Sequence, residues 1–215
     1  MIRARAAVAD AGRIYVDLDD VLAQTIHALV ALLERHFARR VEIEDVVHFD
    51  LGRSFGLAPD ELAEFMRLVH QPQVLGALEP SPGAVPALTS WIERGYAVAV
   101  MTGRPPSAAS ASRRWLREHR IPHTSFACID KYGRPDWEGP AGRAPSLDEL
   151  AGLGFALAVE DSLEVAALLV ERCSVPVALM DRPWNRDLSG LNPAARAGIV
   201  RCHGWAELAE RFPHP

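Results

Sequence analysis

The stretch GRIYVDLDDVLAQ, from Gly12 to Gln24, places a short apolar run directly before three carboxylates. The run Ile14–Val16 is typical of a strand buried inside a protein. Asp17, Asp19 and Asp20 follow at once. Buried carboxylates need a counter-charge, which a divalent cation would supply. Asp17 and Asp19 are two residues apart, so their side chains leave an extended chain on the same side and can act on one ligand.

The composition is that of a globular chain. Its 215 residues are 49% apolar and 24% charged, which indicates one large domain or one domain with a modest insertion. The net charge of −5 argues against a nucleic-acid polymer as the main partner, because phosphate-backbone binders carry a basic surface. Three separated cysteines without a CxxC pair indicate reduced thiols and a cytoplasmic protein. No segment has the roughly 18 apolar residues of a membrane span, and the N-terminus lacks a secretory apolar run, so we expect no membrane partner.

Apolar runs alternate with amphipathic segments along the chain. They predict strands over 13–18, 96–101, 126–129, 155–159, 175–180 and 198–202, and helices over 22–38, 84–94, 107–119, 163–172 and 205–212. This alternation predicts an α/β fold with a Rossmann-like parallel sheet flanked by helices. Residues 24–79 contain no convincing strand and predict a helical insertion after the first strand, which leaves 1–23 and 80–215 as the core. Ser107 is predicted to cap its helix, and the Gly- and Pro-rich segment 133–145 is predicted to be a loop.

Polar side chains follow four of the predicted strands. These groups are Asp17-Leu18-Asp19, Thr102-Gly103-Arg104, Asp130-Lys131 and Glu160-Asp161-Ser162. In open parallel sheets, ligands bind in the crevice beyond the carboxyl ends of the strands. One such group would be weak evidence, but four groups at four strand ends are a strong indication of a site.

The carboxylates in these groups suit attack on a phosphate monoester. Mg²⁺ takes oxygen ligands and relieves the repulsion between a carboxylate and a phosphate. We expect Asp17 and Asp161 to ligate it through their side chains and Asp19 through its backbone carbonyl. Asp17 then serves as the nucleophile and forms an aspartyl-phosphate, while Asp19 gives and takes protons as the general acid and base.

The remaining groups suit the binding of the phosphate. Thr102 offers a hydroxyl, and the backbone N–H groups of Gly103 and Arg104 form a small anion-binding nest. Lys131 supplies a positive charge to the phosphate and to Asp17.

Simpler roles stay open for several of these residues. Asp19 could only cap the helix that follows it, and Asp20 is better explained as a helix-start carboxylate than as a catalytic one. Lys131 could be a solvated loop residue. Glu160 fits a water-bridged position near the metal better than direct ligation.

The four groups, in this order, resemble the motifs of the haloacid dehalogenase superfamily of phosphohydrolases, over roughly Ile14 to Phe212. The carboxylate at Asp19 implies phosphoryl chemistry, because the dehalogenases of the superfamily lack it. The helical insertion matches the superfamily's first cap position, so 24–79 is expected to be a cap that selects the substrate.

Within the superfamily the chain is most similar to the 5'(3')-deoxyribonucleotidase family and its bacterial relatives. The supporting segments are Asp181–Asn185, Asp130-Lys131 and Ile199–Trp205. The chain departs from that family at Asp20, where Gly is usual, and at Glu160, where Asp is usual, and its 133–145 loop is extra.

The resemblance implies a Mg²⁺-dependent phosphomonoesterase for small phosphorylated metabolites, with nucleoside monophosphates preferred, and it favours a homodimer. Phe49 is the best candidate in the cap for a substrate contact; His48, Phe55, Phe65 and Met66 could either join it or form the core of the cap. Arg53 and Arg104 are candidates for a second contact with an anionic group. The alternatives are a phosphotransferase or mutase of the same superfamily and a non-catalytic protein that binds a phosphometabolite.

Overall fold

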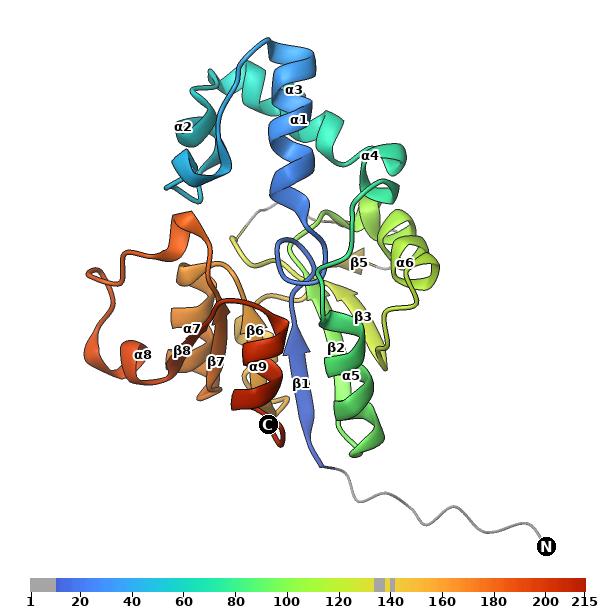
Figure 1. The fold of residues 1–215 in the computed structure, drawn as a ribbon, viewed down its shortest axis with the longest axis vertical. Helices are drawn as coiled ribbons and strands as arrows, with labels where there is room; N and C mark the ends of the chain where they lie inside the picture. Colours follow the sequence, from blue (N-terminus) through green and yellow to red (C-terminus); the bar gives the residue numbers. More distant parts are fainter. Residues whose placement is uncertain (1–10, 134–137, 140–141) are drawn as a thin grey trace, which may run out of the picture.

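One parallel sheet organises the chain in the computed structural model, which describes residues 11–133, 138–139 and 142–215 (Figure 1). Its six strands lie in the order β3-β2-β1-β6-β7-β8. They are β1 (Arg13–Val16), β2 (Ala97–Thr102), β3 (Ser125–Cys128), β6 (Phe155–Glu160), β7 (Val177–Met180) and β8 (Ile199–Cys202). The chain runs outward from β1 to β3 and then returns to place β6 on the other side of β1. The reversal at β1 and β6 creates the switch point where such sheets bind ligands.

Helices cover both faces of this sheet, which confirms the predicted fold class. Along β1, Ile14 and Val16 point into one apolar cluster and Tyr15 into the other, as the two-residue period of a strand requires. Helices α5 (Ala84–Glu93), α6 (Ala109–Glu118) and α9 (Trp205–Arg211) pack in the first cluster. Helix α7 (Leu163–Cys173) packs in the second, together with the 3-10 turn η3 (Asp148–Leu150), and α8 (Pro193–Ala197) lies against α7.

Between Gln24 and Glu79 the chain forms helices and no strand of the sheet, and this segment stands over the carboxyl ends of the strands (Figure 1). It contains α1 (Thr25–Phe37), η1 (Ile43–Asp45), α2 (Leu51–Phe55), α3 (Pro59–Val69) and α4 (Pro72–Gly76). The apolar stripe of α1, with Ile26, Leu29 and Leu33, packs with Phe55 and Phe65 in a third cluster. The buried side chains of this segment therefore form a core largely of their own.

The chain enters and leaves this helical segment through two adjoining stretches. The backbone N–H of Gln24 donates to Glu79 O at 2.9 Å, and that of Ser81 donates to Leu22 O at 2.7 Å. These hydrogen bonds tie the two crossings together beside the end of β1.

Two local predictions differ from the structure. Ser107 does not cap α6: it lies inside the 3-10 turn η2 (Pro106–Ala108), because Pro106 starts a turn before the helix begins at Ala109. The predicted loop 133–145 contains two short antiparallel strands, β4 (Glu138–Gly139) and β5 (Gly142–Arg143), while 134–137 and 140–141 lie outside the described residues. Across the described part of the chain, no helix is both long and apolar enough to cross a membrane.

Candidate active site

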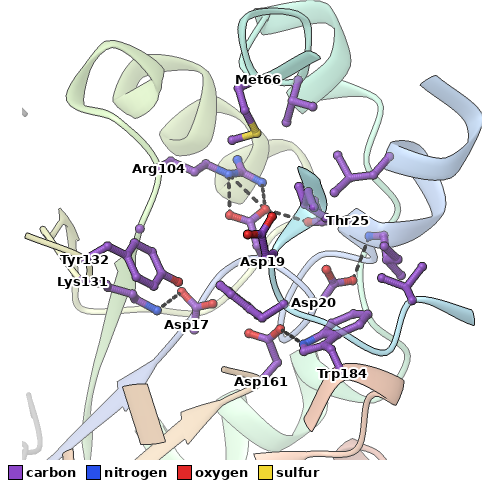
Figure 2. Close-up of a pocket in the computed structure, with 18 of the residues that line it drawn as sticks. Asp17, Asp19, Asp20, Thr25, Met66, Arg104, Lys131, Tyr132, Asp161 and Trp184 are labelled. Atoms are coloured by element: carbon purple, nitrogen blue, oxygen red, sulfur yellow. Dashed lines mark hydrogen bonds and ion pairs between the residues drawn. The ribbon is translucent and has the colours of Figure 1, made fainter. Parts of the chain in front are cut away.

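Three acidic side chains meet where β1 and β6 end. One carboxylate oxygen from each of Asp17, Glu160 and Asp161 lies within 4.8 Å of the others. All three residues are at least nine-tenths buried. They meet because β1 pairs with β6, which brings together residues about 140 positions apart in the sequence. Figure 2 shows Asp17 and Asp161 pointing toward the same space at the base of a cavity.

Lys131 lies beside this acidic group and is itself buried, so it is not a solvated loop residue. Its Nζ lies 2.8 Å from Asp17 Oδ1 and also forms an ion pair with Glu160. Burial by itself would lower the pKa of Lys131, but the charges of Asp17 and Glu160 outweigh it and raise that pKa well above its usual value. Lys131 therefore stays charged at neutral pH.

The surroundings of Asp17 raise its pKa and leave one of its carboxylate oxygens without a hydrogen-bond partner among the described residues. Burial, with the charge of Glu160, raises the pKa of the Asp17 carboxyl to about 8, although Lys131 opposes this shift. Apart from its 2.8 Å ion pair with Lys131, Asp17 Oδ1 has no hydrogen-bond partner among the described residues. Burial and the neighbouring carboxylates also raise the pKa of Asp161 well above its usual range. One lysine does not balance three carboxylates, and an oxygen set of this kind fits a hard divalent cation.

Glu160 has both carboxylate oxygens already engaged. Oε1 accepts from the Tyr15 hydroxyl at 2.9 Å and contacts Lys131. Oε2 accepts from the backbone N–H groups of Asp161 at 3.0 Å and Ser162 at 3.1 Å. Glu160 thus fixes the turn that carries Asp161.

Asp19 is held by a different set of residues. The guanidinium of Arg104 donates to both of its oxygens, with Nη2 at 2.6 Å from Oδ1 and Nε at 2.9 Å from Oδ2. The Thr25 hydroxyl donates to Oδ1 at 2.6 Å. Burial alone would raise the pKa of Asp19, but the charge and hydrogen bonds of Arg104 and Thr25 outweigh it and lower that pKa. The side chain of Asp19 keeps 31% of its surface exposed, so it faces the cavity as well.

The end of β2 lies against this pair. Thr102 is fully buried, and its Oγ1 accepts the backbone N–H of Arg104 at 3.1 Å. That N–H, predicted to bind an anion, is therefore already donated in this structure. Gly103 lines the cavity, and a Cβ there would lie only 3.2 Å from the Tyr132 ring and 3.3 Å from Lys131.

Asp20 also lines the cavity, but its carboxylate is bonded to the chain that follows it. Its backbone adopts a positive φ of 53°, and its buried carboxylate accepts the backbone N–H of Ile26 at 2.9 Å. Burial raises its pKa to about 7. The contact with the first turn of α1 agrees with a helix-start role.

A cavity of about 420 Å³ opens above the carboxylates. The sheet edge forms its floor, and residues of the helical segment, including His48, Phe49 and Met66, form its roof. Phe49 is 44% exposed, with its ring centroid 6.0 Å from that of Tyr132. Phe55 and Phe65 are instead buried in the core of the helical segment, and Arg53 is not part of the cavity lining.

The structure adds three site residues that the sequence analysis did not single out. Thr25 bonds Asp19, Tyr132 faces Phe49, and Trp184 bonds Asp161 (Figure 2). Tyr132 directly follows Lys131 and Trp184 lies in the Asp181–Asn185 segment, so proximity to a motif was the available signal. Their contacts, however, depend on how distant segments pack.

Comparison with known proteins matches the sequence of this chain to nucleotidases. The model of the family described as "5' nucleotidase, deoxy (Pyrimidine), cytosolic type C protein" matches residues 12–132, more than half of the chain. The protein "Putative nucleotidase BH1399" of Halalkalibacterium halodurans is 23% identical over 91% of this chain and 89% of its own length.

Two solved structures share the fold. A HAD family hydrolase from Deinococcus radiodurans R1, with bound phosphate and sodium, matches with a TM-score of 0.61 and 17% identity over 96% of this chain and 97% of its own. A predicted phosphatase from Clostridium acetobutylicum matches with a TM-score of 0.61 and 11% identity over 95% and 99%.

Proposed function

Because the chain belongs to the cytosolic type C family of 5' (deoxy) nucleotidases and is a phosphatase of the haloacid dehalogenase superfamily, we propose that it is a Mg²⁺-dependent phosphomonoesterase with Asp17 as its nucleophile. One observation carries this proposal. Asp17 lies at the base of a cavity, between a buried lysine and a second buried aspartate, Asp161, at the switch point of the sheet. This arrangement supplies an oxygen nucleophile, a fixed positive charge and a metal-binding oxygen set at one place.

The residues present fit the proposed cation. The side chains of Asp17 and Asp161 would hold Mg²⁺, with the backbone carbonyl of Asp19 as a third ligand. The oxygens of Glu160 accept hydrogen bonds from the Tyr15 hydroxyl and from the backbone N–H of Asp161, so Glu160 holds the backbone of Asp161 in place. When bound, Mg²⁺ supplies positive charge that offsets the repulsion between carboxylate and phosphate.

The protein's own residues account for the proton and bond changes. An oxygen of Asp17 attacks phosphorus, the bond from phosphorus to the ester oxygen breaks, and an aspartyl-phosphate forms. For this step Asp19 must carry a proton, although its contacts with Arg104 and Thr25 favour its ionised form in the free site. It gives that proton to the leaving oxygen and then takes one from the water that attacks the phosphorus. The phosphate leaves with the water oxygen, and Asp17 is regenerated. Lys131 stabilises the negative charge on the phosphoryl oxygens throughout, and Thr102 and Gly103 border the space that they occupy.

Substrate choice falls to the helical segment, which we take to be a cap of residues 24–79. Its roof residues make much of the cavity apolar, and the Phe49 and Tyr132 rings offer surfaces on which a base could stack. A cavity of about 420 Å³ lies in the range of small-molecule sites. Together with the nucleotidase relatives, this favours nucleoside monophosphates among small phosphorylated metabolites. The cytoplasmic location and the homodimer stay predictions.

The test is phosphate release across a panel of nucleoside monophosphates and sugar phosphates, with and without Mg²⁺. We expect Mg²⁺-dependent release that is fastest with a nucleoside monophosphate. Transfer of the phosphoryl group to an added sugar phosphate, rather than to water, would instead identify a phosphotransferase or mutase. No release from any member would overturn the proposal and leave a binding protein.

A further inference from the structure

The segment Asp181–Arg186, which follows β7, touches the proposed metal site from outside the four motifs. The guanidinium of Arg182 donates to the backbone oxygen of Asp20. The indole of Trp184 and the amide of Asn185 both contact Asp161. One short segment therefore bonds to the chain after β1 and to the chain after β6.

Asn185 fixes the backbone of Asp161. Its Nδ2 donates to Asp161 O at 2.7 Å and to Met180 O at 2.8 Å, and the residue is fully buried. Its own Oδ1 accepts from Arg201 at 2.6 Å, so the amide is locked in orientation. With the backbone of Asp161 held in this way, the torsions of its side chain decide where its carboxylate points.

Trp184 restrains these side-chain torsions of Asp161. Its Nε1 donates to Asp161 Oδ2 at 3.0 Å (Figure 2). Across the described part of the chain, this indole is the one hydrogen-bond donor to the Asp161 carboxylate, and no ion pair holds it. Lys131, the nearby cation, pairs instead with Asp17 and Glu160.

The ring of Trp184 also packs against the helical segment, and this contact holds the indole in position for its hydrogen bond. It is half-buried, lines the cavity and packs against the apolar cluster of the helical segment. Just beyond it, Arg186 reaches Glu44 of that segment at 2.8 Å. An indole already held by these contacts loses little conformational freedom when it forms the hydrogen bond. A hydrogen bond to a buried carboxylate is also stronger than one in water.

We propose that Trp184 is a positioning residue for the metal: its indole N–H fixes the Asp161 carboxylate so that the second oxygen is presented to the cation. The inference rests on the proposed function, because it takes Asp161 as a metal ligand. Groups that orient a ligand in this way typically contribute 10- to 100-fold to metal affinity.

The test measures Mg²⁺ binding directly, by isothermal titration calorimetry, in the wild type and in Trp184→Phe. This change keeps an aromatic ring against the cap and removes the donor. Trp91→Phe is the matched control, since Trp91 also donates one indole bond, to Phe212 O at 2.9 Å, but lies in the core on α5. We expect roughly 10-fold or greater weakening of Mg²⁺ binding in Trp184→Phe and unchanged binding in Trp91→Phe. Phosphate release by Trp184→Phe should largely recover at saturating Mg²⁺.

The outcomes separate the inference from the proposed function. Wild-type Mg²⁺ affinity in a folded Trp184→Phe, with normal wild-type hydrolysis, overturns the inference alone. A wild type that neither binds Mg²⁺ nor releases phosphate overturns both. If Trp184→Phe does not fold, the indole N–H signal of Trp184 in the NMR spectrum of the wild type decides: a shift on adding Mg²⁺ supports the inference, and no shift overturns it.

Discussion

Replacing Asp17 with Asn separates the chemistry of the site from its stability. The change removes the proposed nucleophile and almost no volume. We expect kcat to fall by about 10⁴-fold or more, the scale on which loss of a nucleophile acts. Asp187→Asn, which alters an exposed carboxylate, is the control and should keep the wild-type rate.

The geometry also predicts how Asp17→Asn changes the free energy of unfolding in the absence of metal. At an effective dielectric constant of about 20, Asp17 attracts Lys131 at 2.8 Å by about 6 kcal/mol. The same estimate gives about 3.5 kcal/mol of repulsion from each of Glu160 and Asp161, whose oxygens lie within 4.8 Å. Attraction and repulsion nearly cancel, and burial then disfavours the charge. The Asn variant should therefore unfold in urea with a free energy within about 1 kcal/mol of the wild type, or higher.

Two results would refute this reasoning. Mg²⁺-dependent release at more than about 1% of the wild-type rate would mean that Asp17 is not the nucleophile. A metal-free loss of more than about 2 kcal/mol would mean that the attraction of Lys131 outweighs the crowding of the carboxylates. Added Mg²⁺ should raise the melting temperature of the wild type more than that of the variant, because the variant lacks one ligand.

Other perturbations test separate contacts of the site. Arg104→Gln should lower kcat by about 10-fold or more because Asp19 loses its two-point support, and steady-state kinetics with an unchanged kcat would contradict this. Tyr15→Phe should cost about 1–3 kcal/mol in urea unfolding, since it removes a donor from the buried Glu160, and a cost near zero would show that the bond is dispensable. Burial would raise the pKa of Asp181, but its bonds to two arginines outweigh burial and lower that pKa. The contribution of Asp181 to the stability of the fold is therefore complete above its unfolded pKa of about 3.9. It is lost as the pH falls through the lower folded value. Thermal unfolding should therefore show the wild type losing its advantage over Asp181→Asn below about pH 4, and an advantage that persists through acidification would contradict the ion pairs.

The local sequence was enough to identify the strands that carry the chemistry. Runs such as Ile14–Val16 and Phe155–Val159 are apolar because both faces of a parallel sheet are buried. Each run therefore shows its own burial in its composition, without reference to the rest of the chain. The polar residues directly after each run then had to lie at one edge. Lys131, which alone could have been a solvated side chain, is buried beside Asp17 as this rule implies.

Boundaries were less predictable where turns compete with helices. The helix predicted over 107–119 begins at Ala109, because two prolines favour a 3-10 turn before it. The sequence did not predict the paired strands at 138–139 and 142–143, because the glycines and prolines of that segment indicate a loop. In both cases local geometry, rather than the apolar pattern, decided the outcome.

The sequence by itself determined the sheet, the helical insertion and the carboxylates at the strand ends, because strand burial and side-chain alternation are local properties of the chain. Only the tertiary structure decided which groups hold those carboxylates. Arg104 reaches Asp19 across 85 positions and Trp184 reaches Asp161 across 23. Such partners follow from the order of the strands and the packing of the helices over them. The stretch that begins at Gly12 thus specifies the candidate nucleophile, and distant segments position it.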